Sequence, residues 1–501
     1  MDARGILRSG LLLLLLLLPS CGGGGGSGSG GPPAAEIVYV LEKDSSQNGS
    51  VQYFAMNPAN GSFYNGSNIL STGGTVPVSL VADPSNDDLY VLNNNSSGAS
   101  SPGSVTSFSA ASYGTTATLI SNGVPTGPNP VNMAVDPKGG YLVVADHGDG
   151  ESASPGDVRV YSLSGGKVTK LGSPWTNGTS GTSGCPNPFR VVFAPGATGA
   201  TSDEVVVVCS SPELVATGST SSVPPIEVYE CTLSALTSNQ SCGTPVYFNS
   251  SSSSPAAITA FAFDPSGKFA AAPQVNGSGS SAGGLLLICS YPFSSSCPTN
   301  NPTSKSNRWF TTESVAFFSG STGEEVYAGN YNPTTYSPSS SNFGGFVNNS
   351  NEMAYCFTSS STPPTLGKSS SSCSILTMTE NSQSIGDPYY FFVSGSYLYI
   401  VVTGEPLSGP YLTTGPTAAI SPKGYLLSCY VGRTSCNVYP TGNGPVSVST
   451  DPQTGHYLFV PTVSGTVSVF SGAGSGSLMP LPSLSLPSGN AALSVVVLTP
   501  P

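Results

Sequence analysis

Cysteine is the residue type whose spacing in this sequence points most directly to chemistry. The chain has 11 cysteines, and ten of them form local pairs: Cys185 with Cys209, Cys231 with Cys242, Cys289 with Cys297, Cys356 with Cys373, and Cys429 with Cys436. Zinc would need further ligands, but no C-x-x-C motif is present and there are only two histidines. A redox-active pair would need a basic neighbour that lowers the thiol pKa, and none recurs beside these cysteines. The pairs therefore predict five disulfides and an oxidising compartment.

The stretch ADHGDGESASPGD holds the densest group of polar side chains, namely Asp146, His147, Asp149, Glu151 and Asp157. Several carboxylates on a glycine-rich loop could surround Ca²⁺, which takes about six to eight oxygen ligands. The candidate calcium ligands are Asp146, Asp149 and Glu151. The alternative is an acidic loop surrounded by water, because the spacing does not match an EF-hand. No other cofactor is expected.

The stretch NYNPTTYSPSSSNFGGFVNNSN places four aromatic residues among asparagine, serine and glycine: Tyr331, Tyr336, Phe343 and Phe346. This mixture is typical of binding loops, in which aromatic rings supply contact area and small polar residues adapt to the partner. We predict that these rings bind a glycan or a protein. The alternative is that they fold back and pack the loop against the domain.

The sequence around these residues predicts β-strands, which would hold them in place. From Glu36 onward the chain repeats a short apolar strand, a tight turn that often contains Asp-Pro, a second apolar strand, a loop and a third alternating strand. Sheets of about four strands that recur in this way predict a single all-β propeller, in which each blade packs against its neighbours. The number of first strands favours eight blades over seven.

The Asp-Pro turns contain Asp83, Asp136, Asp264 and Asp451. We interpret them as structural, because aspartate bonds the backbone of its own turn and proline fixes φ. Long loops follow the second strands and open on the opposite face of the propeller. Rigid scaffolds present function on such loops, so we expect binding on that face.

The two ends of the repeat region predict how the ring closes. EIVYVL, at Glu36–Leu41, has the character of a second strand but lacks a first strand, whereas LSVVVLTP near the C-terminus is a first strand with no copy after it. Joining them would complete one blade and hide two open edges.

Through DPSNDDLYVLN, DPKGGYLVVAD and SGTVSVFS, the sequence resembles the YVTN-type β-propeller repeats and the related propeller lactonases. The resemblance covers nearly all of residues 36–500 and implies seven blades, with a site of histidine, arginine and glutamate at the central channel. PNPFRVVFAP supplies Arg190, but Val191 stands where that family has histidine. A lactonase-like hydrolase that uses Arg190 and nearby carboxylates is therefore the alternative to a binding function. Its base could come from His147 or from His456, although His456 lies in a turn and is expected to be exposed without a catalytic role.

The N-terminus resembles the signal of a bacterial lipoprotein. Arg4 and Arg8 precede the apolar run Leu11–Leu18, which is too short to span a bilayer. LPSC resembles a lipobox, which implies cleavage before Cys21 and acylation of that cysteine. We assign residues 1–20 to the signal peptide, 21–35 to the lipidated cysteine and a Gly/Ser/Pro-rich tether, and 36–501 to the propeller. An ordinary secretory signal with an incidental cysteine is the alternative.

The charge of the chain excludes some classes of binding partner. A net charge of −12 argues against nucleic acid and anionic membrane surfaces, since both attract basic proteins. We expect a monomer that contacts the cell envelope only through its lipid anchor, and the glycine after Cys21 favours the outer membrane. The expected function is binding or scaffolding through the long-loop face, with Arg190 and the aromatic loop as the binding residues.

Overall fold

The computed structural model describes residues 36–499 with gaps. The gaps are 65–67, 86, 96–100, 111–115, 149–154, 177–184, 186, 196–203, 210–226, 248–255, 259, 277–282, 294–298, 301–314, 321–322, 331–351, 359–372, 378, 381–382, 385–386, 404–423 and 432–435. Within the described ranges, no helix is long and apolar enough to cross a bilayer.

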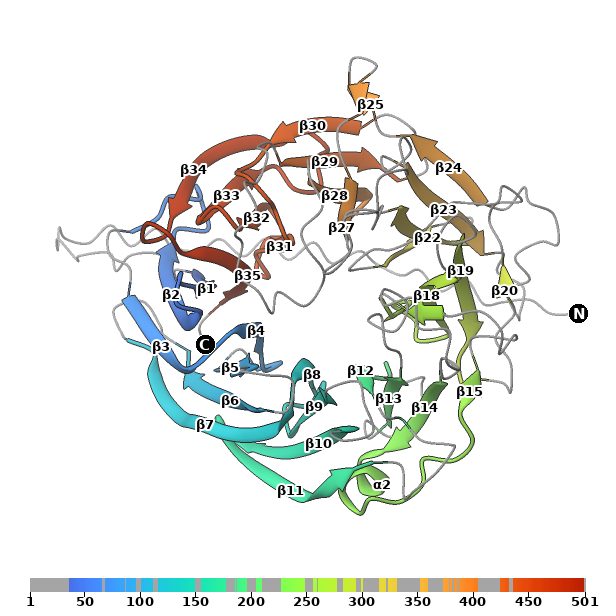
Figure 1. Ribbon diagram of the computed structural model, residues 1–501. Helices are drawn as coiled ribbons and strands as arrows, with labels where there is room; N and C mark the ends of the chain where they lie inside the picture. Colours follow the sequence, from blue (N-terminus) through green and yellow to red (C-terminus); the bar gives the residue numbers. More distant parts are fainter. Residues whose placement is uncertain are drawn as a thin grey trace, which may run out of the picture. The chain divides into compact units, whose positions relative to one another are not determined.

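The described residues form antiparallel sheets placed around one axis (Figure 1). Eight sheets have four or five strands, and a small ninth sheet pairs β25 (Thr379–Glu380) with β26 (Gln383–Ser384). We call the eight larger sheets blades 1 to 8 in the order in which the chain first reaches them. The prediction of an all-β propeller is confirmed.

Each of the first four blades has four strands. From the innermost strand to the outermost, blade 1 has β35 (Ala491–Leu498), β1 (Glu36–Lys43), β2 (Asn48–Met56) and β3 (Asn68–Thr75). Blade 2 has β4 (Pro77–Ala82), β5 (Asp88–Asn93), β6 (Pro102–Ser109) and β7 (Thr118–Pro128). Blade 3 has β8 (Pro130–Val135), β9 (Tyr141–Gly148), β10 (Pro155–Ser164) and β11 (Lys167–Trp175). Blade 4 has β12 (Pro188–Phe193), β13 (Glu204–Cys209), β14 (Glu227–Thr232) and β15 (Val246–Tyr247), with the short helix α2 (Leu233–Thr237) before β15.

The other four blades follow in the same order from the axis outward. Blade 5 has β16 (Ala256–Ile258) and β17 (Ala262–Phe263), then β18 (Phe269–Asn276), β19 (Gly283–Ser290) and β20 (Thr299–Asn300). Blade 6 has β21 (Ala316–Gly320), β22 (Gly323–Asn330), β23 (Glu352–Thr358) and β24 (Cys373–Thr377). Blade 7 has β27 (Asp387–Ser394), β28 (Tyr397–Thr403), β29 (Tyr425–Tyr430) and β30 (Cys436–Pro440). Blade 8 has β31 (Ser449–Thr450), β32 (Tyr457–Thr462), β33 (Thr466–Ser471) and β34 (Met479–Ser485).

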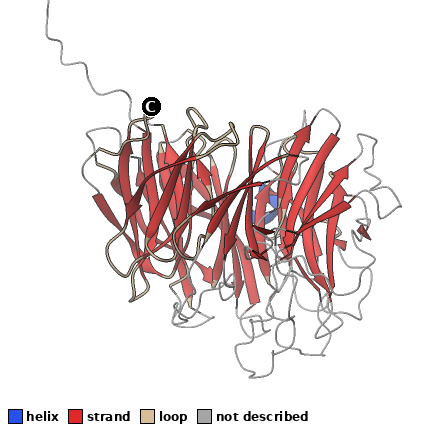
Figure 2. Ribbon diagram, turned by 90° about the horizontal axis from the view of Figure 1, so that it is seen from above, coloured by secondary structure: helices blue, strands red, loops and turns tan. Residues whose placement is uncertain are grey.

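Blade 1 is built from both ends of the described chain, as predicted. β35 pairs antiparallel with β1, and Leu498 lies opposite Ile37. The N-terminal end of β1 and the C-terminal end of β35 therefore meet at the same face, where Figure 2 marks the C-terminus. This pairing closes the ring and covers the edge of β1 that would otherwise be open.

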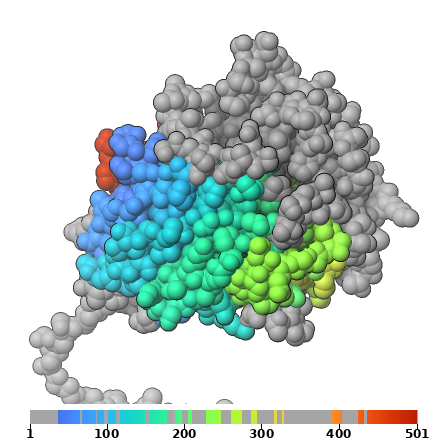
Figure 3. All heavy atoms as spheres, turned by 60° about the horizontal axis from the view of Figure 1, so that its bottom comes forward, coloured from blue at the N-terminus to red at the C-terminus, as the bar shows by residue number. Residues whose placement is uncertain are grey.

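Apolar side chains hold consecutive blades together. Tyr39, Leu80 and Phe108 share one buried cluster between blades 1 and 2, and Val38 belongs to another between blades 8 and 1. A cluster of this kind joins every pair of consecutive blades. Because side chains alternate across a strand, β1 sends Val38 to one neighbour and Tyr39 to the other. Figure 3 shows the result from outside, with consecutive parts of the chain side by side from blue to green.

The Asp-Pro turns have a structural role. Asp83 accepts hydrogen bonds from the backbone N–H groups of Asp87 and Asp88 at 3.0 and 3.1 Å. Comparable bonds within the turn are accepted by Asp136, Asp264 and Asp451. The structural interpretation of these turns is confirmed. Since adjacent strands are antiparallel, the connections after the second strands leave from the opposite face.

Candidate functional site

Arg190 lies on the innermost strand of blade 4 and has no ion-pair partner among the described residues. Its side chain is partly buried, and Nε is buried without a hydrogen-bond partner. Among the described residues, the ion pairs all belong to Arg159. The guanidinium carbon lies 5.8 Å from the centre of the Phe189 ring, near the outer limit of a cation–π contact. The Arg190 guanidinium is thus a candidate to bind a polar or anionic ligand.

Tyr390, on β27 in blade 7, interacts electrostatically with Arg190. Burial raises the pKa of Tyr390, and the positive charge of Arg190 opposes that rise. Blades 5 and 6 lie between the two residues in the ring, so this interaction passes across the axis. With its pKa raised, the phenol keeps its proton at neutral pH and can donate a hydrogen bond.

Asn132 ties the neighbouring inner strand to this position. The backbone N–H of Val191, the residue after Arg190, donates to Asn132 Oδ1 at 2.9 Å. The sequence analysis missed both Asn132 and Tyr390. An asparagine inside the apolar strand PVNMAV was a usable signal, whereas Tyr390 sits in YYFFV, which has the composition of a core strand.

The predicted calcium loop needs correction. Asp146 and His147 are buried at the end of β9, and Asp157 lies opposite Asp146 on β10, so these residues belong to strands and not to one loop. Arg159 Nε lies 3.4 Å from Asp146 Oδ2 and 2.8 Å from Asp157 Oδ1. Asp146 therefore faces a guanidinium in the interior and is not an exposed calcium ligand.

The other two predicted calcium ligands lie outside the described ranges. Asp149 and Glu151 fall in the gap 149–154. In the part of the chain that the structure describes, no group of three or more acidic, histidine or cysteine side chains could hold a metal ion.

The surroundings of Asp146 favour its protonated form. Burial raises the pKa of Asp146 well above its ordinary value, the Asp157 carboxylate raises it further, and Arg159 opposes the shift. Asp157 accepts two hydrogen bonds from Arg159, both at 2.8 Å. We therefore assign a neutral Asp146 beside the salt bridge between Arg159 and Asp157. With Asp146 0% exposed, the group is part of the junction between blades 2 and 3 and not a catalytic dyad.

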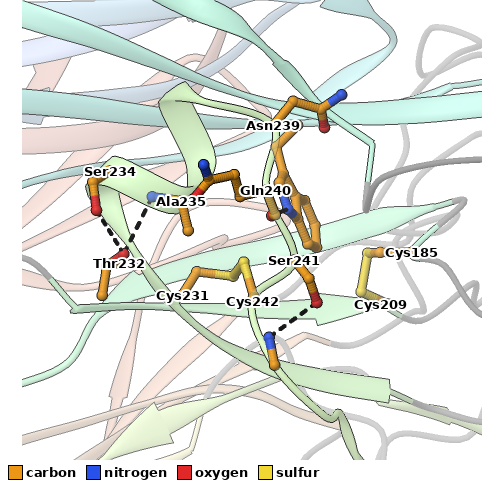
Figure 4. The surroundings of a disulfide bond; sticks show 12 residues. Cys185, Cys209, Cys231, Thr232, Ser234, Ala235, Asn239, Gln240, Ser241 and Cys242 are labelled. Atoms are coloured by element: carbon orange, nitrogen blue, oxygen red, sulfur yellow. Dashed lines mark hydrogen bonds between the residues drawn. A yellow bond between two sulfur atoms is a disulfide. The ribbon is translucent and has the colours of Figure 1, made fainter.

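Three predicted disulfides are present among the described residues. They are Cys185–Cys209, Cys231–Cys242 and Cys429–Cys436, with Cα separations of 5.2, 4.7 and 4.2 Å. Figure 4 shows the first two in blade 4, one of them beside α2. These pairings are confirmed.

The remaining cysteines are described only in part. Cys289 is disulfide-bonded, and its predicted partner Cys297 lies outside the described residues. The backbone of Cys356 lies directly opposite that of Cys373, as a hairpin disulfide requires. Cys21 lies outside the described residues, so its acylation stays a prediction.

The other candidate residues do not join Arg190 in the described structure. His456 is exposed and packs edge-on against Tyr457, with ring centres 5.0 Å apart. Tyr331, Tyr336, Phe343 and Phe346 lie in the gap 331–351, so binding by the aromatic loop stays a prediction.

Comparison with known proteins supports a β-propeller that is similar to the propeller lactonases. Residues 33–188 match the family described as "Lactonase, 7-bladed beta-propeller". The match ends two residues before Arg190, and the eight blades of this chain differ from the seven in that description. No curated protein matches the chain. The chain is thus similar to the lactonase propellers over its N-terminal third.

Solved structures are similar to the whole ring. The dihydro-heme d1 dehydrogenase NirN aligns with a TM-score of 0.54 at 11% identity, covering 92% of this chain and 74% of that one. Sqt1 from Chaetomium thermophilum gives 0.51 at 12% identity, covering 82% and 87%. The periplasmic gluconolactonase PpgL of Pseudomonas aeruginosa gives 0.49 at 13% identity, covering 93% and 100%. At these identities the first two alignments show a shared fold and nothing more.

Proposed function

We propose that the chain is a lactonase-like hydrolase that opens a small lactone at the axis of the propeller, between Arg190 and Tyr390. The observation that carries the proposal is the electrostatic interaction between the neutral phenol of Tyr390 and Arg190, which has no ion-pair partner among the described residues; the two lie on non-adjacent inner strands. The family match over residues 33–188 supports the reaction class.

The chemistry follows from where charge develops. When water adds to the carbonyl carbon of a lactone, negative charge builds on the carbonyl oxygen, and the ring C–O bond then breaks to give a hydroxy acid. Arg190 and Tyr390 can both donate hydrogen bonds to that oxygen. Removing one such donor from an enzyme costs about 10²–10³ in kcat.

The proton acceptor comes from solvent in this proposal. Neither a guanidinium nor a neutral phenol can take a proton from the attacking water. The reaction should therefore depend on hydroxide, and its rate should rise with pH while the phenol stays protonated. This dependence separates the proposal from a histidine-based mechanism, whose rate would level off above the pKa of the imidazole.

The test is a hydrolysis assay with the full-length protein and a panel of small lactones, followed by acid release. Turnover that rises with pH and depends on Arg190 supports the proposal. Turnover no faster than in buffer, for wild-type protein with intact disulfides, would end it.

A second candidate function is binding without turnover. It is favoured by the surroundings of Arg190, because its described neighbours are the aromatic rings of Phe189 and Tyr390 and not a base. A small hydroxylated acid would then pair with the guanidinium and stack on a ring. Calorimetry with hydroxy acids, in a protein that shows no turnover, distinguishes this function from the first.

We further propose that the protein is anchored as a monomer in the bacterial envelope, at the outer membrane, through acylated Cys21. The apolar run before that cysteine and the disulfides support export to an oxidising compartment. Metabolic labelling with a fatty acid should mark the wild type and not Cys21→Ala. Equal labelling of both would overturn the assignment. A protein or glycan partner at the long-loop face remains part of the binding candidate.

A further inference from the structure

Lys43 is a buried lysine without a countercharge in the described structure. It is the last residue of β1 in blade 1, and only 3% of its surface is exposed. The described ion pairs belong to Arg159, and no hydrogen bond joins the Lys43 amine to another described residue. A buried charge without a partner is unfavourable, and lysines are seldom this buried unless they are paired.

The acidic residues next to Lys43 in the sequence are engaged elsewhere. Glu42 accepts a hydrogen bond from the Ser50 hydroxyl at 2.7 Å. Asp44 accepts bonds from the backbone and the side chain of Asn48 at 2.8 and 3.0 Å. Both carboxylates are thus held in local contacts that do not include the amine.

The residues directly opposite Lys43 on the neighbouring strands carry no acceptor side chain. Lys43 lies opposite Gly49 on β2 and Ala491 on β35. By alternation it shares the face of β1 on which Leu41 packs toward blade 2. Thr72, which would lie close to any side chain placed at Gly49, already donates its hydroxyl to the Gly49 carbonyl. Lys43 Nζ is not one of the side-chain atoms that are fully buried without a partner, so the amine reaches solvent while the rest of the side chain is buried.

We propose that Lys43 is a carbonyl-reactive amine that captures a small aldehyde or ketone as an imine. Its surroundings favour the uncharged amine, whose lone pair makes it a nucleophile. Lys43 ends β1 at the face where second strands connect to third strands, which is the face expected to receive ligands. The proposal concerns a second site, in blade 1, and does not depend on the lactone chemistry at Arg190.

The reaction balances without a further reagent. The amine nitrogen attacks the carbonyl carbon, the C–N bond forms, and the carbonyl oxygen leaves as water with two protons from nitrogen. No electrons are gained or lost. Burial lowers the pKa of Lys43, which increases the fraction of reactive amine at neutral pH. A neutral imine also fits this site better than an ammonium ion.

The test is reductive trapping on the folded, full-length protein. Glycolaldehyde and cyanoborohydride are added at pH 7, and modification of each lysine is followed by peptide mass spectrometry. Lys138 and Lys268, which are exposed on turns, are internal references. We expect Lys43 to react several-fold faster than either, because burial lowers its pKa and increases the fraction of uncharged amine at pH 7. The advantage should disappear above pH 11 and after unfolding in guanidinium.

Two results would overturn the proposal. One is a Lys43 that reacts no faster than the exposed lysines at pH 7, which would mean a hydrated, protonated side chain. The other is an equal advantage in unfolded protein, which would mean that local sequence and not the fold activates the amine. Lys43→Arg is the matched variant: it should lose the modified peptide while Lys138 and Lys268 react as before.

Discussion

Glu36, the first residue of β1, lies beside Asp451 of the neighbouring blade 8, at the junction where the ring closes. Glu36 is 0% exposed, and the backbone N–H of Gln453, in the Asp451 turn, donates to Glu36 Oε1 at 3.3 Å. Burial raises the pKa of Glu36 from 4.5 to about 7, and the charge of Asp451 contributes to the rise. The closure of the propeller therefore holds an acid that takes up a proton near neutral pH.

Replacing Glu36 with glutamine should stabilise the protein above pH 7. The folded chain binds the Glu36 proton more tightly than the unfolded chain, so this contribution to stability is complete below pH 4.5 and is lost as the pH rises through about 7. Glu36→Gln removes that loss, and we expect a gain of about 1–3 kcal/mol at pH 8 and little change at pH 4.5. Thermal unfolding of both proteins at pH 4.5 and at pH 8 measures this change in stability.

Glu42→Gln is the matched control for this prediction. Glu42 lies at the other end of β1 and accepts hydrogen bonds from Ser50 and Asn490 at 2.7 and 3.1 Å. Losing the carboxylate there should destabilise the protein at pH 8. A gain at pH 8 in both variants would contradict the role given to Glu36.

Breaking the Cys185–Cys209 disulfide should cost more stability than breaking Cys429–Cys436. The first closes a loop with a sequence separation of 24 residues and the second one of 7 residues. On the chain-entropy model the losses are about 3 and about 2 kcal/mol, since a longer loop constrains the unfolded chain more. Double alanine variants in guanidinium unfolding give the two values. A larger loss for the Cys429–Cys436 variant would contradict this order.

The architecture was readable from the sequence because it depends on patterns that are local in the chain. Alternating apolar residues marked the inner strands, and EIVYVL without a preceding first strand predicted the pairing of β1 with β35. Cysteine spacing identified the disulfides because partners across a hairpin are separated by short loops. In each case a short stretch of sequence contains the whole signal.

The candidate site was less predictable, because its residues are far apart in the sequence and only the folded ring brings their strands to the axis. Arg190 and Tyr390 are 200 positions apart in the chain, and only the closed ring brings their strands around the same axis. Asp146 appeared to belong to a loop because of the glycines and charges that follow it, but the strand continues through it to Gly148. Whether a carboxylate is neutral or ionised depends on burial and on Arg159, and the sequence alone carries neither.

The buried acid pair should respond unequally to amidation. Asp146→Asn replaces a group that is already neutral, because burial and Asp157 raise its pKa. We therefore expect a change within about 1 kcal/mol at pH 7, or a gain at higher pH where the native acid would ionise. Asp157→Asn leaves the partly buried Arg159 without its countercharge and with only one acceptor oxygen in place of two, which should cost about 3–5 kcal/mol. Urea unfolding at pH 7 compares them, and equal losses would contradict the assignment of charge.

Arg190→Ala should reduce kcat/KM for lactone hydrolysis by about 10²–10³, because it removes a cationic donor to the developing oxyanion. Tyr390→Phe should reduce it by about tenfold, since a neutral hydroxyl is lost while the ring remains. Lys138→Ala removes an exposed cation outside the site and should change nothing. Initial rates between pH 6 and 9 measure all three, together with the wild type. If Arg190 instead binds a ligand without catalysis, the loss will appear in the affinity for hydroxy acids and no variant will change the rate of lactone opening.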